Sequence, residues 1–532
     1  MHPRFGTKQK SAPHYTFVEE ATSAPEIAYY DYIIIGGRTA GCPLAATLSQ
    51  NARVLVLERG GSPYDNPNIT NMETFSSTLS DTSPTSPTQH FTSEDGVFNL
   101  VGTRHETSVN KSYEWVEKLV FKPPKMDYQV AVRDGLLEAG VLPYNGFTYD
   151  HLYGTKIGGT IFDRKGHRHT AANLLEYADP RKITIYLHAT VCKILFRYNN
   201  AEQQDLKLMV WFSKMHRAGV FHKAYLMKNS KSFNEIILSA DAIGSPQQLM
   251  LSVLGQVTNI YRPMGSRFGN YIEANSGLSF IFSSSAQRLS RDLGQLRQNF
   301  GGTACNELYL GFVLLNKVIY LNEFEETLLK LHTNQPFTVP PKAMVKVVET
   351  INAIAKKTFK GSVVVEKVAY PPSLGYLKLR NTNPKDNPAL TFNYFKEPED
   401  LRGFVLGMST IMNVIDTYPF SKFRHRNMTM QALLDMVVSL LWNKRPQHPS
   451  AAFSLEQFCI DTVMTMWHFH GGCQVGKVVD HDYKVLGVDA LRVIDGSTFL
   501  QSPGTNPQAT VMMLGRYMVE KILHERRSHG RK

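Results

Sequence analysis

The sequence predicts an α/β protein whose chain opens on a parallel β-sheet. Two short apolar runs, residues 32–35 and 54–57, have the length and composition of buried strands. A glycine-rich turn and a helix-like segment over about residues 42–49 lie between them. The three elements form a strand–helix–strand unit of about thirty residues, which is the building unit of parallel sheets. The last third of the chain returns to the same alternation of strand, turn and helix.

The middle of the chain has a different pattern. Residues 276–460 mix strand-like runs such as 308–313 with helix-like runs such as 404–415. Residues 75–95 are rich in Ser, Thr and Pro, which predicts a long loop. A length of 532 residues allows about three to four domain-sized units, or two large interleaved ones.

The composition is typical of an ordinary globular protein. Hydrophobic residues make up 42% of the chain and charged residues 20%, which excludes disordered, collagen-like and coiled-coil proteins. No stretch approaches the ~18 consecutive apolar residues of a membrane span, so we expect no integral membrane segment. Residues 1–6 lack the apolar core of a secretory signal, and the compartment stays unknown at this stage.

Charge and cysteine spacing argue against two classes of partner. The net charge of +12 is spread along the chain, and its densest basic block, residues 526–532, is typical of a solvated terminus. Basic and aromatic residues are not interleaved in any block, so we do not expect nucleic acid as a partner. The five cysteines are widely scattered and form neither a metal-binding spacing nor a disulfide framework.

The turn after the first predicted strand resembles a dinucleotide-binding fingerprint. Gly36 and Gly41 occupy the first and last glycine positions of that fingerprint, but Arg38 occupies the middle one. A side chain there projects toward the phosphate oxygens, and arginine offsets this only if its stem turns aside to pair with them. Glu58 ends the second strand, where an acidic side chain can accept hydrogen bonds from an adenosine ribose. The alternative is a strand–helix turn that binds no ligand.

A second group of polar residues lies near the C-terminus. His468 and His470 are two residues apart, on one side of a strand if the strand continues, and only Cys473 is close enough to join them as a metal ligand. We therefore predict no metal site. Farther along, Asn506 suits the N-cap of a helix and Pro507 its first position. The start of that helix favours negative charge, although a capped structural helix is the alternative.

Taken together, these segments resemble the glucose–methanol–choline (GMC) flavoprotein oxidoreductases. The most similar branch is the plant group of HOTHEAD-like proteins and mandelonitrile lyases. The resemblance covers most of residues 29–250 and 370–520 and little of the segment between about 276 and 370. It rests on the first strand–helix–strand unit, on the segment from Trp467 to Met518, and on motifs at residues 147–151, 158–163, 168–172, 187–191, 244–247 and 379–384.

The resemblance implies a Rossmann-like FAD-binding domain, assembled from both ends of the chain, and a substrate domain with an antiparallel sheet. The predicted division is a flexible N-terminal arm (1–28), an N-terminal FAD-binding region (29–275), a substrate-binding region (276–460) and a C-terminal segment that completes the FAD domain and active site (461–532).

The resemblance also implies the cofactor contacts. Glu58 would hold the adenosine ribose, and the backbone of Val191 would contact the adenine. Asp495 and Gly496 would meet the FAD phosphates or ribityl chain, and Trp467 would lie beside the flavin. The full predicted cofactor-binding set is Gly36, Thr39, Ala40, Gly41, Glu58, Arg59, Val191, Trp467, His468, Asp495, Gly496, Asn506 and Pro507.

The implied chemistry is alcohol oxidation. His468 would act as general base on the substrate hydroxyl, Asn506 would hold the same oxygen, and hydride would pass to flavin N5. The substrate would be a small alcohol or, in the lyase branch, a cyanohydrin.

Three departures from the family pattern keep two alternatives open. Arg38 replaces a glycine, a glycine-rich loop is missing between residues 95–99 and 113–117, and Val253 stands where the family has glycine. The first alternative is a cyanohydrin lyase whose FAD takes no redox part, although Asn506 favours oxidation because the lyases tend to carry histidine there. The second is a flavin-free family member without activity, which Arg38 and the missing loop favour.

Overall fold

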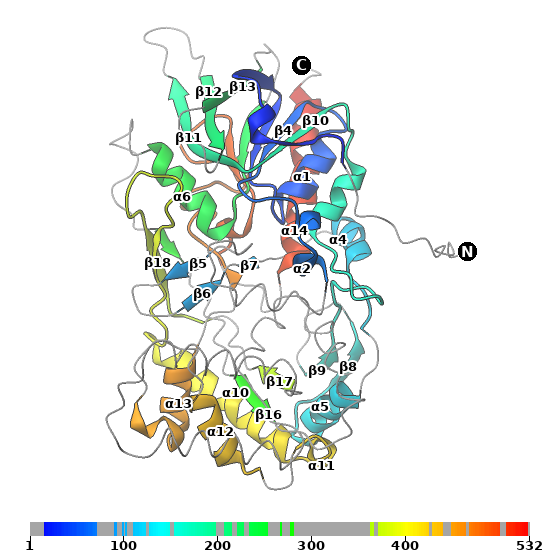
Figure 1. Ribbon diagram of the computed structural model, residues 1–532, viewed down its shortest axis with the longest axis vertical. Helices are drawn as coiled ribbons and strands as arrows, with labels where there is room; N and C mark the ends of the chain where they lie inside the picture. The colour runs from blue at the N-terminus through cyan, green and yellow to red at the C-terminus, as the bar shows by residue number, and fades with distance from the viewer. Residues whose placement is uncertain are drawn as a thin grey trace, which may run out of the picture.

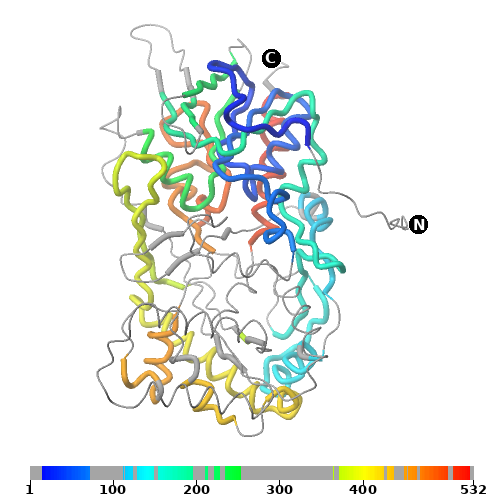
Figure 2. The backbone as a smooth tube through the Cα atoms, in the orientation of Figure 1, coloured from blue at the N-terminus to red at the C-terminus, as the bar shows by residue number. Residues whose placement is uncertain are grey.

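The computed structural model contains two regions (Figure 1). One is built around a parallel sheet with the helices α1 and α14, and the other is rich in helices and contains α10 to α13. Both ends of the described chain run through the sheet region (Figure 2). The structure describes residues 15–71, 90–92, 98–100, 102–103, 110–123, 127–148, 154–197, 207–214, 221–227, 234–253, 266–268, 277–280, 362–365, 371–424, 428–439, 448–463, 468–500 and 507–529.

The central sheet has six parallel strands in the order β1-β10-β4-β3-β14-β21. Every residue of β3, β4 and β14 is buried, because both faces of the sheet are covered, and such strands appear in sequence as unbroken apolar runs. The predicted α/β class is confirmed, and β3 and β4 have the predicted bounds. The strands are β1 (Val18–Glu20), β10 (Ile183–Leu187), β4 (Val54–Leu57), β3 (Tyr32–Ile35), β14 (Glu235–Leu238) and β21 (Leu491–Val493).

The N-terminal residues of the described chain belong to two sheets. Strand β1 pairs with β10 at the edge of the central sheet, and β2 (Ile27–Tyr30) pairs with β13 (Phe221–Leu226). The prediction of a flexible arm was therefore wrong for residues 15–28. Val18, Glu19 and Glu20 are exposed or half-buried, so this edge strand lacks the apolar run by which the sequence marks a central one.

One face of the central sheet is covered by α1 (Gly41–Leu48) and α14 (Gln508–His529), which lie side by side although they come from opposite ends of the chain (Figure 1). Their contact is close at Gly515, where an added Cβ atom would lie 2.5 Å from the carbonyl oxygen of Ala40. The sequence thus uses glycine where two helix backbones meet.

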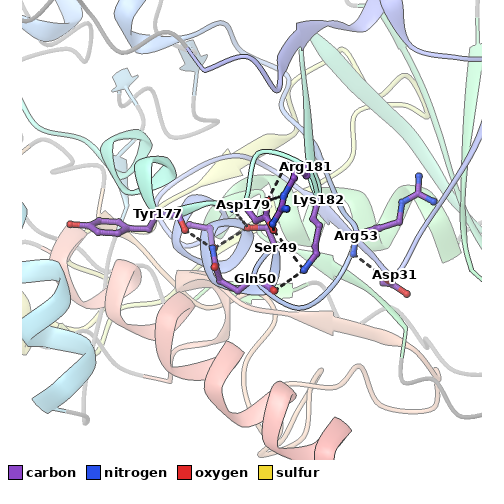
Figure 3. A network of polar contacts seen from close by, with 9 residues as sticks. Asp31, Ser49, Gln50, Arg53, Tyr177, Asp179, Arg181 and Lys182 are labelled. Atoms are coloured by element: carbon purple, nitrogen blue, oxygen red, sulfur yellow. Dashed lines mark hydrogen bonds and ion pairs between the residues drawn. The ribbon is translucent and has the colours of Figure 1, made fainter.

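Polar contacts fix the far end of α1 to the segment that leads into β10 (Figure 3). The Ser49 hydroxyl accepts a hydrogen bond from the Asp179 N–H at 3.0 Å, and the Gln50 amide donates to the Tyr177 carbonyl at 2.6 Å. Lys182 in turn donates to the Gln50 carbonyl at 2.9 Å. These bonds hold the C-terminal end of α1 beside the start of β10.

A buried ion pair ties α14 to the sheet. Arg492 of β21 donates to Glu235 at the start of β14 at 2.8 Å and to Glu525 of α14 at 2.6 Å. The arginine side chain is only 1% exposed. Two carboxylates therefore compensate the charge of this arginine. Without an ionic partner, a buried cation would strongly destabilise the fold.

A second sheet covers the other face, in the order β11-β12-β13-β2. Its buried side chains pack against those of the central sheet and form one apolar cluster. Within this sheet, β11 pairs with β12 and β12 with β13 in antiparallel fashion, whereas β13 and β2 are parallel. The two remaining strands are β11 (Ala189–Arg197) and β12 (Lys207–Lys214).

The helix-rich region has its own apolar core. The predicted helix at 404–415 lies inside α10, whereas the predicted strand at 308–313 and most of the predicted loop at 75–95 lie outside the described residues. A three-stranded antiparallel sheet lies beside α6 (Asp241–Val253), and its residues Leu377 and Leu390 belong to one apolar cluster with Ala242 and Ile243 of that helix (Figure 1). The elements are α5 (Asp127–Glu138), β15 (Ser266–Phe268), β16 (Gly277–Phe280), β17 (Ser362–Val365), β18 (Gly375–Lys378), β19 (Ala389–Thr391), α10 (Pro398–Asp416), α11 (Tyr418–Ser421), α12 (Met430–Ser439) and α13 (Leu455–Thr462).

Shorter elements connect the two regions or line the site. Within the described part of the chain, no helix is both long and apolar enough to span a membrane. The domain boundaries proposed from the sequence stay predictions. The shorter elements are α2 (Pro67–Thr70), β5 (His90–Thr92), β6 (Phe98–Leu100), β7 (Gly102–Thr103), α4 (Asn110–Val116), β8 (Tyr144–Phe147), β9 (Thr155–Ile157), α6 (Asp241–Val253) and β20 (His468–Phe469), with 3-10 turns η1 (Ala21–Ser23), η2 (Pro63–Asp65), η3 (Glu117–Leu119), η4 (Ala171–Tyr177), η6 (Pro449–Ala452) and η7 (Gly496–Thr498).

The close contact between α1 and α14 can be tested with two glycine substitutions. We expect Gly515→Ala to lower the free energy of unfolding by about 1–3 kcal/mol, because the new methyl group overlaps the Ala40 carbonyl. Gly403→Ala is the matched control, since Gly403 is an exposed helical glycine with no atom near its absent Cβ. The control should gain about 0.5–1 kcal/mol from helix propensity. Denaturant unfolding measures both, and a stable Gly515→Ala protein would contradict the close packing.

Candidate functional site

The turn between β3 and α1 requires glycine at two positions. Gly36 has a φ of +103°, and an added Cβ atom would overlap the carbonyl oxygen of Ser239. At Gly41, the first residue of α1, a Cβ atom would overlap the carbonyl oxygen of Gly36. The first and last positions of the predicted fingerprint therefore have the backbone geometry of a dinucleotide-binding turn. The turn is tight, and the start of the helix packs close to the strand.

Glu58 is held at this turn by two backbone groups. Its carboxylate accepts a hydrogen bond from the Gly37 N–H at 2.8 Å and another from the Gly60 N–H at 2.6 Å. These bonds fix the carboxylate beside the turn, at the end of β4. A carboxylate oxygen can accept more than one hydrogen bond, so Glu58 keeps acceptor capacity for a ribose hydroxyl.

A pocket opens beside the turn. Its walls come from the ends of β3 and β4, the start of β11 and the first turns of α6. Of the predicted residues it contains Gly36, Glu58, Arg59 and Val191, whereas Thr39, Ala40, Gly41, His468, Asp495, Gly496 and Pro507 are not in its lining. Lining residues that sequence reasoning missed are Ile35, Leu57, Ala189, Thr190, Ala240, Asp241, Ile243, Gly244, Gln247, Gln248 and Pro384.

The family motif at residues 244–247 could have located two of the missed lining residues, Gly244 and Gln247. The motif contributes to the resemblance, but no role was predicted for it from the sequence. In the structure it forms the first half of α6, and Gln248 donates a hydrogen bond to the Val191 carbonyl at 3.0 Å. Gln247 donates to the Asp386 carbonyl at 2.8 Å. Both amides therefore fasten α6 to neighbouring segments at the pocket wall.

Arg38 also lines the pocket, and its guanidinium turns toward α6. Its Nη1 atom donates to Oδ2 of Asp241 at 3.4 Å. The Arg38 side chain is 33% exposed and that of Asp241 only 4%. The stem of the arginine thus does turn aside, and its guanidinium pairs with a carboxylate of this chain.

Several charges in the pocket influence one another. Burial raises the pKa of Asp241 to about 7, with Arg38 opposing the rise and Asp495 adding to it. Burial also lowers the pKa of Arg59 to about 10, and the nearby charge of Arg38 contributes to that decrease. The pocket therefore contains two cations, Arg38 and Arg59, and two carboxyl groups, those of Glu58 and of Asp241, whose pKa burial raises to about 7.

Asp495 lies behind the pocket and joins two segments, α6 and η7. Its Oδ2 atom accepts hydrogen bonds from the Asp241 N–H at 2.9 Å and the Ser245 hydroxyl at 2.6 Å, while Oδ1 accepts from the Ser497 N–H at 2.8 Å. The side chain is buried, and burial raises its pKa. Asp495 is thus a positioning residue that links the start of α6 to the turn η7.

The His468 segment is connected to the same junction. The Gly471 N–H donates to the Gly496 carbonyl at 3.2 Å, and the Cys473 N–H donates to the Ser497 carbonyl at 2.9 Å. Hydrogen bonds therefore run from the α6 end of the pocket, through the Asp495 carboxylate and η7, to the segment that carries the histidine.

His468 itself is only 1% exposed. It lies on β20, which pairs in parallel with β7. The next residue, Phe469, stacks on Phe392 with ring centroids 5.5 Å apart and an interplanar angle of 11°. Pairing on one side and aromatic packing on the other fix the backbone from which the imidazole projects.

His470 has a different chemical character. Its side chain is buried, and burial lowers its pKa to about 3. The imidazole is therefore neutral near pH 7 and a weak base. Among the described residues, no group of three or more His, Cys, Asp or Glu side chains is arranged to hold a metal ion.

The start of α14 completes the described part of the region. The helix begins at Gln508, one residue later than predicted, and the buried Pro507 accepts the Val511 N–H at 3.0 Å through its carbonyl. Trp467 and Asn506 lie outside the described residues. The roles assigned to these two side chains stay predictions.

Comparison with known proteins identifies the family. Residues 371–515 match the family model of the GMC oxidoreductases. The chain is 41% identical over 573 aligned positions to Protein HOTHEAD of Arabidopsis thaliana, with 98% of this chain and 94% of that protein covered. This chain belongs to the GMC oxidoreductase family. It is also 38% identical to an (R)-mandelonitrile lyase-like protein of Arabidopsis thaliana, with 96% and 92% of the two chains covered.

Solved structures of GMC oxidoreductases share the fold. Formate oxidase aligns with a TM-score of 0.64 at 17% identity, covering 95% of this chain and 100% of the other. Pyridoxine 4-oxidase aligns with a TM-score of 0.60 at 16% identity, covering 93% and 99%. At such low identity the likeness supports the fold alone.

FAD is the cofactor of GMC oxidoreductases, and the described pocket fits its adenosine half. Gly36 and Gly41 allow the tight turn and the close packing of α1 on the strand, and the backbone N–H groups and helix dipole at the start of α1 favour a diphosphate. Glu58 lies at the end of the next strand, within the same lining. The charges of Arg38 and Arg59 suit an anionic ligand.

The junction at Asp495 can be tested by a small substitution. We expect Asp495→Asn to lower the free energy of unfolding by about 1–3 kcal/mol, because either amide orientation places an NH2 group against a hydrogen-bond donor. Asp386→Asn is the control, since Asp386 is exposed and, among the described residues, its carboxylate accepts hydrogen bonds from the side chains of Asn381 and Asn383. Thermal or denaturant unfolding that shows the same loss in both variants would contradict the special role of Asp495.

Proposed function

We propose that this GMC oxidoreductase uses FAD to oxidise the CH–OH group of a small alcohol, with His468 as the base. The observation that carries the proposal is the hydrogen-bonded path from the α6 end of the pocket to the buried His468, through Asp495 and η7. A cofactor that spans an adenosine site and a catalytic histidine needs such a rigid connection, because small displacements at either end lower the rate.

The residues of this chain divide the work of holding FAD. The turn from Gly36 to Gly41 would take the diphosphate at the start of α1, Glu58 the ribose, and Val191 the adenine region through its backbone. Asp495 acts indirectly, by fixing Gly496 and the start of α6. Trp467, Asn506 and Pro507 would lie around the flavin end.

His468 would remove the hydroxyl proton of the substrate. A buried imidazole held on a paired strand is well positioned for general base catalysis. Asn506 would hold the substrate oxygen, and the bound FAD supplies the hydride acceptor.

Cyanohydrin cleavage is the second candidate, because the relatives of this chain include both lyase-like and oxidase proteins. They include the (R)-mandelonitrile lyase-like protein described above and, at 34% identity, sinalpyl alcohol oxidase Nec3 of Nesocodon mauritianus. The same base would start either reaction, because both begin at a substrate hydroxyl. We favour oxidation because residue 506 is asparagine, whereas the lyase branch tends to carry histidine there.

A flavin-free protein is the third interpretation. The closely packed glycines and the charged pocket argue against it, since a turn that binds no ligand has no need to keep Glu58, Arg38 and Arg59 at one opening. Visible flavin absorbance of the purified protein, or its appearance after incubation with FAD, distinguishes this interpretation from the other two.

The base can be tested with His468→Ala in the FAD-loaded protein. We expect anaerobic reduction of the flavin by an alcohol to slow by about 10²–10⁴-fold, because the hydroxyl proton loses its acceptor. His481→Ala is the control, since His481 is exposed and lies outside the pocket. Both variants should keep the flavin spectrum.

Three outcomes would change the proposal. An unaltered reduction rate in His468→Ala would remove the base from the mechanism. Cyanide release from a cyanohydrin without flavin bleaching would establish the lyase reaction instead. A protein that stays colourless at saturating FAD would leave both enzymatic functions falsified.

A further inference from the structure

We propose that Arg38 and Asp241 form an exchangeable charge pair: Arg38 leaves Asp241 for the diphosphate of FAD, and the charge on Asp241 sets the strength of cofactor binding. The inference rests on the proposed FAD site. It assigns a binding role to a residue that stands where the fingerprint has glycine, and a regulatory role to a carboxyl group that sequence reasoning missed.

The two side chains differ in their freedom to move. Arg38 follows Gly36 and Gly37 in the turn, and one third of its side chain is exposed. The Asp241 side chain is almost completely buried, and its Oδ1 atom accepts the Ala242 N–H at 2.7 Å. Any exchange of partners must therefore come from a movement of the arginine.

The backbone holds Asp241 in a costly conformation. Its φ is +78°, in the left-handed region that glycine and asparagine tolerate best. Its N–H is bound to Asp495 at 2.9 Å, which fixes the residue at the start of α6. Charged residues thus occupy both the middle fingerprint position and a position suited to glycine, and they pair with each other.

The charges around the pair explain why Asp241 and the FAD diphosphate would compete for Arg38. Glu58 and Arg59 face the pocket from the end of β4, Arg38 from the turn, and Asp495 lies behind Asp241. When Asp241 is ionised, it neutralises Arg38 and adds a negative charge beside the diphosphate site. When Asp241 is protonated, its ionic attraction to Arg38 is lost and the local charge becomes more positive, which favours an anionic ligand.

The sign of the pH dependence follows from linkage. The pKa of Asp241 lies at about 7 in the protein without FAD, and a bound diphosphate would raise it further because like charges repel. FAD binding therefore takes up a proton, and the affinity falls as pH rises through 7. A single linked proton limits this fall to about tenfold per pH unit.

The test is a titration of apoprotein with FAD, followed by quenching of flavin fluorescence between pH 6 and 8.5. We expect wild-type Kd to rise above pH 7. Asp241→Asn should bind FAD about tenfold more tightly than wild type at pH 8 and lose most of the pH dependence. Asp241→Gly should behave alike, and glycine relieves the backbone strain, so at least one variant is expected to fold well.

Two further variants complete the experiment. Arg38→Gln keeps much of the length of the side chain but removes its charge, and it should weaken FAD binding about tenfold at pH 6. Asp179→Asn is the control, because Asp179 also pairs with an arginine, Arg181 at 3.1 Å, but lies at the opposite end of α1 (Figure 3). The control should match wild type at every pH.

The outcomes separate this inference from the proposed function. If FAD binds but both Asp241 variants show the wild-type affinity and pH dependence, or Arg38→Gln binds as tightly as wild type, the charge pair has no such role. If neither wild type nor any variant binds FAD, the inference and the proposed function are both wrong. If binding follows the expected pattern but no alcohol reduces the flavin, only the proposed oxidation fails.

Discussion

The site depends on the carboxylate of Asp495, which is buried and accepts hydrogen bonds from three donors. Burying a carboxylate costs free energy unless its oxygens accept hydrogen bonds, so the fold must keep each donor within hydrogen-bond distance of Asp495. These donors belong to the start of α6 and to η7, and η7 in turn binds the histidine segment through its carbonyl groups. One side chain thus sets the geometry between the cofactor pocket and the proposed base.

The local features of this fold were predictable from the sequence. Strands β3 and β4, the turn between them and the roles of Gly36 and Gly41 follow from patterns within thirty residues of chain. Helix α10 was also recognised, because its apolar residues recur with helical spacing. The family resemblance, which was confirmed, supplied the cofactor.

What could not be predicted depends on contacts between distant segments. Arg38 and Asp241 are 203 residues apart, and the sequence contains no sign that they meet. Strand β1 was missed because an edge strand with exposed side chains has no apolar run. The hydrogen-bond partners of Asp495 on α6 are brought to it by tertiary folding, so they could not be predicted from the sequence.

The joining of both chain ends in one sheet also affects how this protein is made. Strand β21 and helix α14 are translated after the other strands of the central sheet. Until then the nascent chain exposes one edge of β14 and the apolar face of α1 that α14 later covers. Unpaired edges and uncovered apolar surfaces promote aggregation. Molecular chaperones that shield the half-built sheet during translation should therefore raise the yield of native protein.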